Sequence, residues 1–177
     1  QTLLEGQMYM TSFVNGEKYR NSLISIQRKS LELYGTTEFG RDAFKKMQTE
    51  MKSFISLNQI SIETLGNNAA MFQKLGVSLE STAELFDRAA LSYGQLPGEI
   101  DVLSRKLVTM AHNMAMPPQE LIRNFNSAAS TMAYPVNKMV DNFAKLQRVS
   151  RTTGVGFEKL TSAFGDSMDN FGTSAER

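Results

Sequence analysis

The stretch Gly76-Val77-Ser78-Leu79-Glu80 begins a pattern that the chain repeats twice, each time after 39 residues. The second copy begins at Ala115-Met116-Pro117-Pro118-Gln119 and the third at Gly154-Val155-Gly156-Phe157-Glu158. In every copy a Phe follows the small first residue at the same distance, as Phe86 does in the first copy, and no residue is inserted between them. A fixed period of this length is typical of chains built from stacked supersecondary units. The repeat therefore predicts an array of similar units.

Apolar side chains inside the repeat recur every three or four positions, which is the spacing of one face of an α-helix. Pro97, Pro117-Pro118 and Pro135 lie where helices are expected to begin, because proline fits the first turn and disrupts the interior. Gly76 and Gly154 lie where helices are expected to end, because glycine readily adopts the left-handed conformation of a C-terminal cap. Each unit is thus predicted to be a helical hairpin whose apolar stripes are covered by stacked neighbours or by another chain.

The repeat becomes weaker upstream of about Gln59. Residues 17–34 read as one helix that ends at Gly35, and residues 38–56 read as a second helix. The first fourteen residues fit either a frayed helix or an extended arm, and Asn15-Gly16 is a turn signal.

The predicted fold class is all-α, with tandem helical hairpins that repeat every 39 residues and are either extended or completed by oligomerisation. Residues 1–58 are expected to form an N-terminal helical segment of two helices plus the ambiguous arm, and residues 59–177 the hairpin repeat region. The chain begins at Gln1, and no helix stop signal follows Phe171-Gly172. We therefore expect a segment of a longer chain in which the repeat continues.

The charge balance and composition exclude several classes of function. The 177 residues carry 19 Lys and Arg against 18 Asp and Glu, a formal net charge of +1, so the chain lacks the basic excess expected of a nucleic-acid-binding protein. The small basic clusters Arg28-Lys29, Lys45-Lys46 and Arg148/Arg151 are read as solvated faces. No apolar run is long enough to cross a bilayer. Because the chain has no Cys, it can form no disulfide, thiol nucleophile or thiolate metal site.

His112 is the single histidine, so a zinc motif with two histidines cannot form, and a histidine-dependent triad would need this residue. It lies two positions away from an apolar stripe and is expected to be a structural or surface residue. Gly154-Val155-Gly156 precedes a helix, but the following residues complete neither a P-loop nor a dinucleotide-binding motif. This stretch is therefore read as a turn between helices.

Carboxylates are the remaining candidates for catalysis. Glu80, Glu84 and Asp87 are three or four residues apart, as are Asp166 and Asp169. Paired carboxylates could serve glycoside hydrolysis if they faced each other across a cleft. Here they share the helix face opposite the Phe stripe, which is typical of a solvated surface. We expect no catalytic, cofactor-binding or metal-binding residues, and no cofactor.

Met and Phe are both frequent, at eleven residues each, and there is no Trp. Met-rich apolar stripes suit surfaces that meet more than one partner, because Met adapts to irregular gaps. Core packing within a single fold is the alternative, and the thin hairpins favour packing between chains. Phe86, Phe125 and Phe164 are predicted to be packing anchors.

The repeat region, residues 60–172, resembles phage tail tape measure proteins. The resemblance rests on the helical, Cys- and Trp-free texture and on the turns Leu75-Gly76-Val77-Ser78-Leu79-Glu80 and Thr153-Gly154-Val155-Gly156-Phe157-Glu158. The turn at Pro117-Pro118 departs from this form, and the N-terminal third lacks the texture.

The resemblance implies a non-enzymatic structural component of a virion that sets tail length or anchors at the tail tip through coiled-coil-like helix packing. It also implies self-association in a few copies, contacts with tail tube, tail-tip or baseplate proteins, and a location in the tail lumen or tip after assembly in the host cytoplasm. No specific nucleic-acid site is evident. Amphipathic helices with Met and Phe could make transient membrane contact, but their polar faces lack the Lys and Arg enrichment expected of interfacial helices.

Two other classes of function remain open. An α-hairpin repeat adaptor would present a concave groove to a protein partner. A lytic enzyme would use Glu80 and Glu84, or Asp166 and Asp169, but no cleft-forming constellation is visible in the sequence.

Overall fold

The computed structural model describes residues 2–131 and 136–163. Within these residues the chain is helical with short connections, and no strand is present, so the predicted all-α class is confirmed. The helices are α1 (Thr2–Tyr34), α2 (Glu38–Glu50), the short 3-10 helix η1 (Phe54–Ser56), α3 (Gln59–Lys74), α4 (Leu79–Asp87), the π-helical turn η2 (Arg88–Ser92), α5 (Pro97–Asn113), α6 (Pro118–Thr131) and α7 (Val136–Thr153). Residues 157–163 are again helical.

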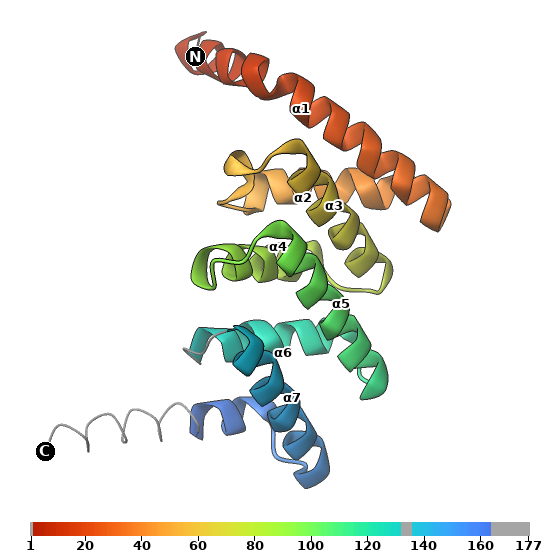
Figure 1. The fold of residues 1–177 in the computed structure, drawn as a ribbon, viewed down its shortest axis with the longest axis vertical. Coiled ribbons are helices and arrows are strands. Elements are labelled where there is room, and N and C mark those ends of the chain that lie inside the picture. Colours follow the sequence, from red (N-terminus) through yellow and green to blue (C-terminus); the bar gives the residue numbers. More distant parts are fainter. Residues whose placement is uncertain (1, 132–135, 164–177) are drawn as a thin grey trace, which may run out of the picture.

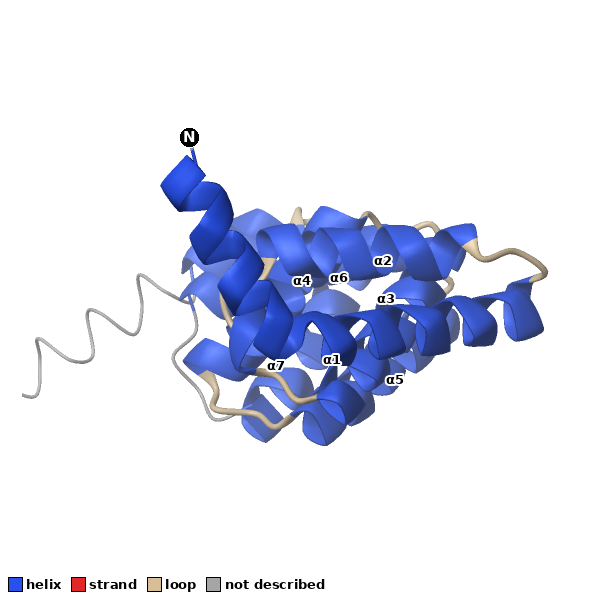
Figure 2. Ribbon diagram, turned by 90° about the horizontal axis from the view of Figure 1, so that it is seen from above, coloured by secondary structure: helices blue, strands red, loops and turns tan. Residues whose placement is uncertain are grey.

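Successive helices alternate between two layers, and the helices within each layer are stacked along one axis (Figure 1). One layer contains α2, α4 and α6, and the other contains α1, α3, α5 and α7; the view from above shows the two layers side by side (Figure 2). Neighbours within a layer pack directly, as α2 does on α4, α4 on α6, α1 on α3, and α3 on α5. Since each hairpin covers the apolar face of the previous one, the chain forms a compact stack rather than an extended array.

Helix starts in the repeat region keep the spacing of the sequence pattern. Helices α4 and α6 begin at Leu79 and Pro118, and the last helical stretch begins at Phe157, so successive starts are 39 residues apart. Ser78 caps α4, because its side chain accepts a hydrogen bond from the Ser81 backbone N–H. The two-layer arrangement also extends upstream of Gln59, where the sequence repeat is weak.

Proline and glycine mark the helix boundaries as predicted, within the described residues. Pro97 and Pro118 are the first residues of α5 and α6, while Pro135 lies outside the described residues. Gly76 and Gly154 follow helices with φ of +83° and +71°, the left-handed region that suits glycine. Ala115 occupies the equivalent position of the middle copy with φ of +47°, as a non-glycine residue in a region that favours glycine.

Two expectations for helix ends are wrong. Helix α1 runs without interruption through Asn15-Gly16, because one internal glycine costs only about 1 kcal/mol and does not by itself end a helix. Residues 2–14 are therefore helical, which decides between the two alternatives left open for this segment. The helix predicted for residues 38–56 ends at Glu50.

One core cluster runs through the whole stack, from Ile26 in α1 to Phe157 beyond α7. Phe86 and Phe125 have 0% and 1% of their surfaces exposed, so both lie inside the chain. At these two residues the apolar stripe is covered within the chain, which is one of the two alternatives for the hairpins, and completion by oligomerisation stays a prediction. Buried side chains on both sides of residue 58 belong to the same cluster, whereas the proposed division into 1–58 and 59–177 stays a prediction.

Polar contacts hold successive units in register. The Gln119 side chain of α6 accepts a hydrogen bond from the Ser78 backbone N–H at 2.6 Å and donates one to the Ser81 hydroxyl at 3.2 Å. In the other layer, the Ser25 hydroxyl of α1 donates to the Glu63 carboxylate of α3 at 2.9 Å. The partners in these bonds are about one repeat apart in sequence, so they fix how one hairpin sits on the next.

Candidate functional site

The carboxylates that the sequence offered for catalysis make contacts within the fold. Glu80 of α4 forms an ion pair with Lys46 of α2, and Glu84 pairs with Arg88 at 2.9 Å. The hydrogen bond from Lys46 lowers the pKa of the Glu80 carboxyl below its usual value, and the same bond raises the pKa of the Lys46 ammonium. A general acid near neutral pH needs the opposite shift in its carboxyl pKa, so Glu80 is poorly suited to that role.

Asp87 has a structural role that the sequence did not predict. Its carboxylate accepts hydrogen bonds from the backbone N–H groups of Lys52 and Ser53, at 2.8 and 3.3 Å, and from the Ser53 hydroxyl at 2.8 Å. These bonds satisfy the backbone just after α2, where the chain leaves the helix. Asp87 therefore joins the end of α4 to the end of α2.

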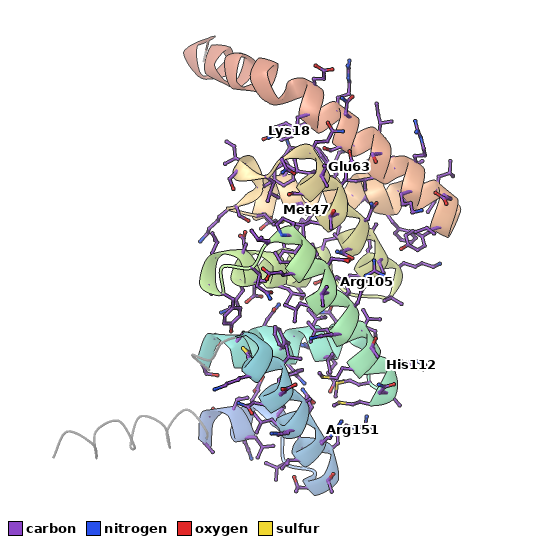
Figure 3. All side chains as sticks on the ribbon, in the orientation of Figure 1. Lys18, Met47, Glu63, Arg105, His112 and Arg151 are labelled. Carbon is purple, nitrogen blue, oxygen red and sulfur yellow. The ribbon has the colours of Figure 1, made fainter. Side chains whose placement is uncertain are left out.

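Of the other positions considered for catalysis or a phosphate-binding loop, the structure describes only His112 and the glycines of the turn at residues 154–156. Asp166, Asp169 and the third anchor, Phe164, lie outside the described residues. His112 is exposed in the last turn of α5, and Figure 3 shows it at the lower end of that helix. Within residues 2–131 and 136–163, no group of three or more His, Asp or Glu side chains could hold a metal ion. None of the helices described there combines the length and hydropathy needed to cross a bilayer.

A groove lies between α5 and α7. Helix α3 packs directly on α5, whereas α5 and α7 make few close contacts, although both belong to the same layer. A cavity of about 620 Å³ lies between them, within the usual size range of ligand pockets. We call this feature the α5–α7 groove; it is lined by Val102, Arg105, Lys106, Thr109, Met110, Asn113 and Met114 of α5 and its end, and by Val140, Asp141, Ala144 and Arg148 of α7.

The packing of α7 explains why this groove stays open. Its apolar stripe turns toward α6 and the last helical stretch, because the Phe143 ring stacks edge-on against Phe125 and Phe157, at centroid distances of 5.2 and 5.3 Å. The face of α7 that remains toward α5 carries Val140 and, two turns further on, Arg148. Helix α7 is thus anchored mainly through the Phe143 side chain and not by contacts with α5.

Charge also opposes closure of the groove. Arg105 and Lys106 project from α5 and Arg148 from α7, against the single carboxylate of Asp141 in the lining. Arg105 is paired with Asp101, four residues earlier in α5, at 3.2 Å. In the part of the chain that the structure describes, no ion pair within 4 Å involves Lys106, Arg148 or Asp141. Like charges on both walls repel when the helices approach, although water screens this repulsion.

Sequence reasoning did not identify the groove, although part of its signal is present. Val102, Lys106 and Met110 are spaced by four residues, and so are Val140, Ala144 and Arg148. Each set forms a second stripe beside the buried one, but a sequence does not tell which stripe of a helix its neighbour covers. Arg148 was read only as part of a solvated basic cluster.

Comparison of the chain with protein-family models, with curated proteins and with solved structures finds no match.

Proposed function

We propose that the chain is a non-enzymatic structural scaffold, whose stacked helical hairpins act by binding other proteins in a larger assembly. The observation that carries this proposal is the two-layer stack with a lateral, largely apolar groove at α5 and α7. Stacked hairpins provide a long, rigid surface, and proteins of this architecture use such surfaces for binding. The engagement of Glu80, Glu84 and Asp87 in intramolecular contacts supports a role without catalysis.

The resemblance of residues 60–172 to tape measure proteins points to a phage tail as the assembly. In this proposal the chain is a tape-measure-like virion component that self-associates in a few copies and meets tail tube, tail-tip or baseplate proteins. The compact stack favours anchoring at the tail tip over measuring length with this segment. A stacked unit adds about 10 Å along the stack, the usual distance between packed helices, whereas 39 residues of continuous helix would add about 60 Å.

The alternative is an α-hairpin adaptor that works outside a virion. The α5–α7 groove is the observation that favours it, because a groove beside a rigid stack can bind a partner in any assembly. Both proposals share the same binding surface and differ in where the protein acts.

Deletion of residues 115–153 from the gene, followed by electron microscopy of the particles, tests the tail role. The deletion removes α6 and α7 and joins α5 to the equivalent turn at Gly154, so the stack can close up. An anchoring role predicts either a failure of tail assembly or non-infectious particles whose tails have nearly unchanged length. Tails shortened by about 60 Å would show that the segment is an extended ruler. Normal, infectious particles of unchanged length would contradict the tail role.

A further inference from the structure

The α5–α7 groove continues beyond the first cavity along the length of α5. A second cavity of about 370 Å³ shares Val102, Lys106 and Val140 with the first, and extends toward Gly98 at the start of the helix. Helix α5 has 17 residues, so the groove follows about 25 Å of helix axis. This length matches a helical segment of about four turns lying alongside.

We propose that the α5–α7 groove binds an amphipathic helix of a partner protein, about four turns long, with apolar side chains on the inserted face and acidic residues on its flanks. The inference rests on the proposed binding function and names the chemistry of the partner. Insertion of one helix face into a groove is a recurring mode of peptide recognition, with anchors three, four and seven residues apart.

The floor of the groove is apolar and matches the apolar face of the proposed helix. Val102 is 51% exposed although it is a β-branched aliphatic residue in a helix that faces another helix. Met110, Met114, Val140 and Ala144 continue the apolar surface. Methionine side chains adapt their shape to the groups that they meet, which suits a floor that receives aliphatic anchors. Covering this floor would remove apolar surface from water, which is the main driving force for association.

The walls of the groove carry positive charges that match the acidic flanks of the proposed helix. Lys106 and Arg148 stand on opposite walls, and neither has an ion-pair partner among the described residues. Acidic residues on both flanks of an inserted helix would meet these two cations. Glu99, at the far end of the groove, already accepts a hydrogen bond from the Leu96 backbone N–H at 2.8 Å. Asp141 is the carboxylate in the lining that would disfavour an acidic neighbour, so the flanking acids should lie beside Lys106 and Arg148.

Fluorescence anisotropy with a synthetic peptide tests the proposal on the whole chain. The probe is a labelled 16-residue helical peptide with leucines at the anchor positions and glutamates on both flanks, and its counterpart carries lysines in place of the glutamates. We expect the glutamate peptide to bind with a Kd of about 10–100 μM and the lysine peptide to bind at least ten times more weakly, a difference of about 1.4 kcal/mol or more.

Charge reversal locates the binding site. The double variant Lys106→Glu with Arg148→Glu should bind the glutamate peptide at least tenfold more weakly and should gain affinity for the lysine peptide. The matched control, Lys138→Glu with Lys145→Glu, changes the net charge equally at exposed positions of α7 outside the groove lining. It should leave both affinities within about twofold, because exposed charges away from the site are screened.

Several results would overturn the proposal. These are equal binding of the two peptides, equal losses in the groove variant and the control, or no binding of the glutamate peptide at 1 mM. Tight binding of duplex DNA that depends on Lys106 and Arg148, or dimerisation that buries Val140, would assign the groove to another occupant.

The groove proposal and the proposed function can fail separately. A negative peptide result together with lost assembly on deletion of residues 115–153 would leave the scaffold role intact. Peptide binding together with normal particles would remove the tail role and keep the groove.

Discussion

Ala115 allows a direct energetic test of the equivalence between repeat units. It has φ of +47°, while Gly76 and Gly154 occupy the equivalent positions with φ of +83° and +71°. A Cβ atom built on either glycine would have no other atom within 4 Å. Substitutions at these sites therefore change the conformational energy of the backbone without adding or removing packing. The informative pair is Ala115→Gly and Gly76→Ala.

The expected magnitudes follow from two opposing effects. A non-glycine residue in the left-handed region costs roughly 1–2 kcal/mol. Replacing Ala by Gly also increases the entropy of the unfolded chain, which lowers stability by about 0.4–1 kcal/mol. The difference predicts that Ala115→Gly raises the free energy of unfolding by about 0.5–1 kcal/mol, and that Gly76→Ala lowers it by a similar amount.

Urea denaturation followed by circular dichroism measures both changes. With a slope near 2 kcal/mol/M, the midpoint should shift by about 0.2–0.5 M, upward for Ala115→Gly and downward for Gly76→Ala. The slope should stay constant, because neither substitution changes the surface exposed on unfolding. A lower midpoint for Ala115→Gly would mean that the entropy of the unfolded chain dominates and that this turn does not share the left-handed cap.

Three further predictions concern packing and charge. Gly40→Ala should lower the free energy of unfolding by about 1–3 kcal/mol, because a Cβ there would lie 2.7 Å from the backbone oxygen of Ile26 in α1. Gly98→Ala is the control in the same urea assay: it has open space around it and should be neutral or stabilising. Phe125→Ala should cost about 3–5 kcal/mol, since the ring is buried between α6 and α7; a calorimetric loss below 1 kcal/mol would contradict its role as an anchor. The lowered pKa of Glu80 means that its bond to Lys46 stabilises the fold above the unfolded pKa of about 4.5 and that this contribution is lost as the pH falls through the lower folded value. Glu80→Gln should therefore reduce the loss of stability on acidification, and an NMR titration that places the Glu80 pKa above 4.5 would refute the pairing.

Helix boundaries set by local chemistry could be predicted from the sequence. Pro97 and Pro118 begin helices because their rings fit a first turn, and Gly76 and Gly154 end them because they tolerate positive φ. The 39-residue period also predicted how far apart in the sequence equivalent helices begin, because each hairpin buries an equivalent apolar stripe. These features depend on residues close together in the sequence.

Boundaries that depend on distant residues could not be predicted. Helix α2 stops at Glu50, and the backbone that follows it is satisfied by Asp87, 35 residues beyond Lys52. No sequence pattern near residue 50 indicates that Asp87 will accept these hydrogen bonds. In the opposite sense, Asn15-Gly16 carries a local turn signal that the continuous helix α1 overrides.

The candidate site was missed for the same reason. The groove exists because Phe143 directs α7 toward α6, which leaves Val140 and Arg148 lining a cavity beside α5. Sequence periodicity shows that α7 has an apolar stripe, but it does not show which neighbour the stripe meets. From the sequence alone, the residues of the groove therefore look like ordinary surface residues, and only the positions of the helices show that they line a groove.

The most direct test of the stacked architecture is the distance between nitroxide labels at opposite ends of the α2–α4–α6 layer. The chain contains no cysteine, so Glu38→Cys in α2 and Glu158→Cys in the last helical stretch, both at exposed positions, can be labelled selectively. Three steps between packed helices predict a distance of about 30 Å by pulsed electron–electron double resonance. A continuous helical arrangement would place the labels about 180 Å apart. A single peak near 30 Å would support the stack, and a distance beyond the range of the method would contradict it.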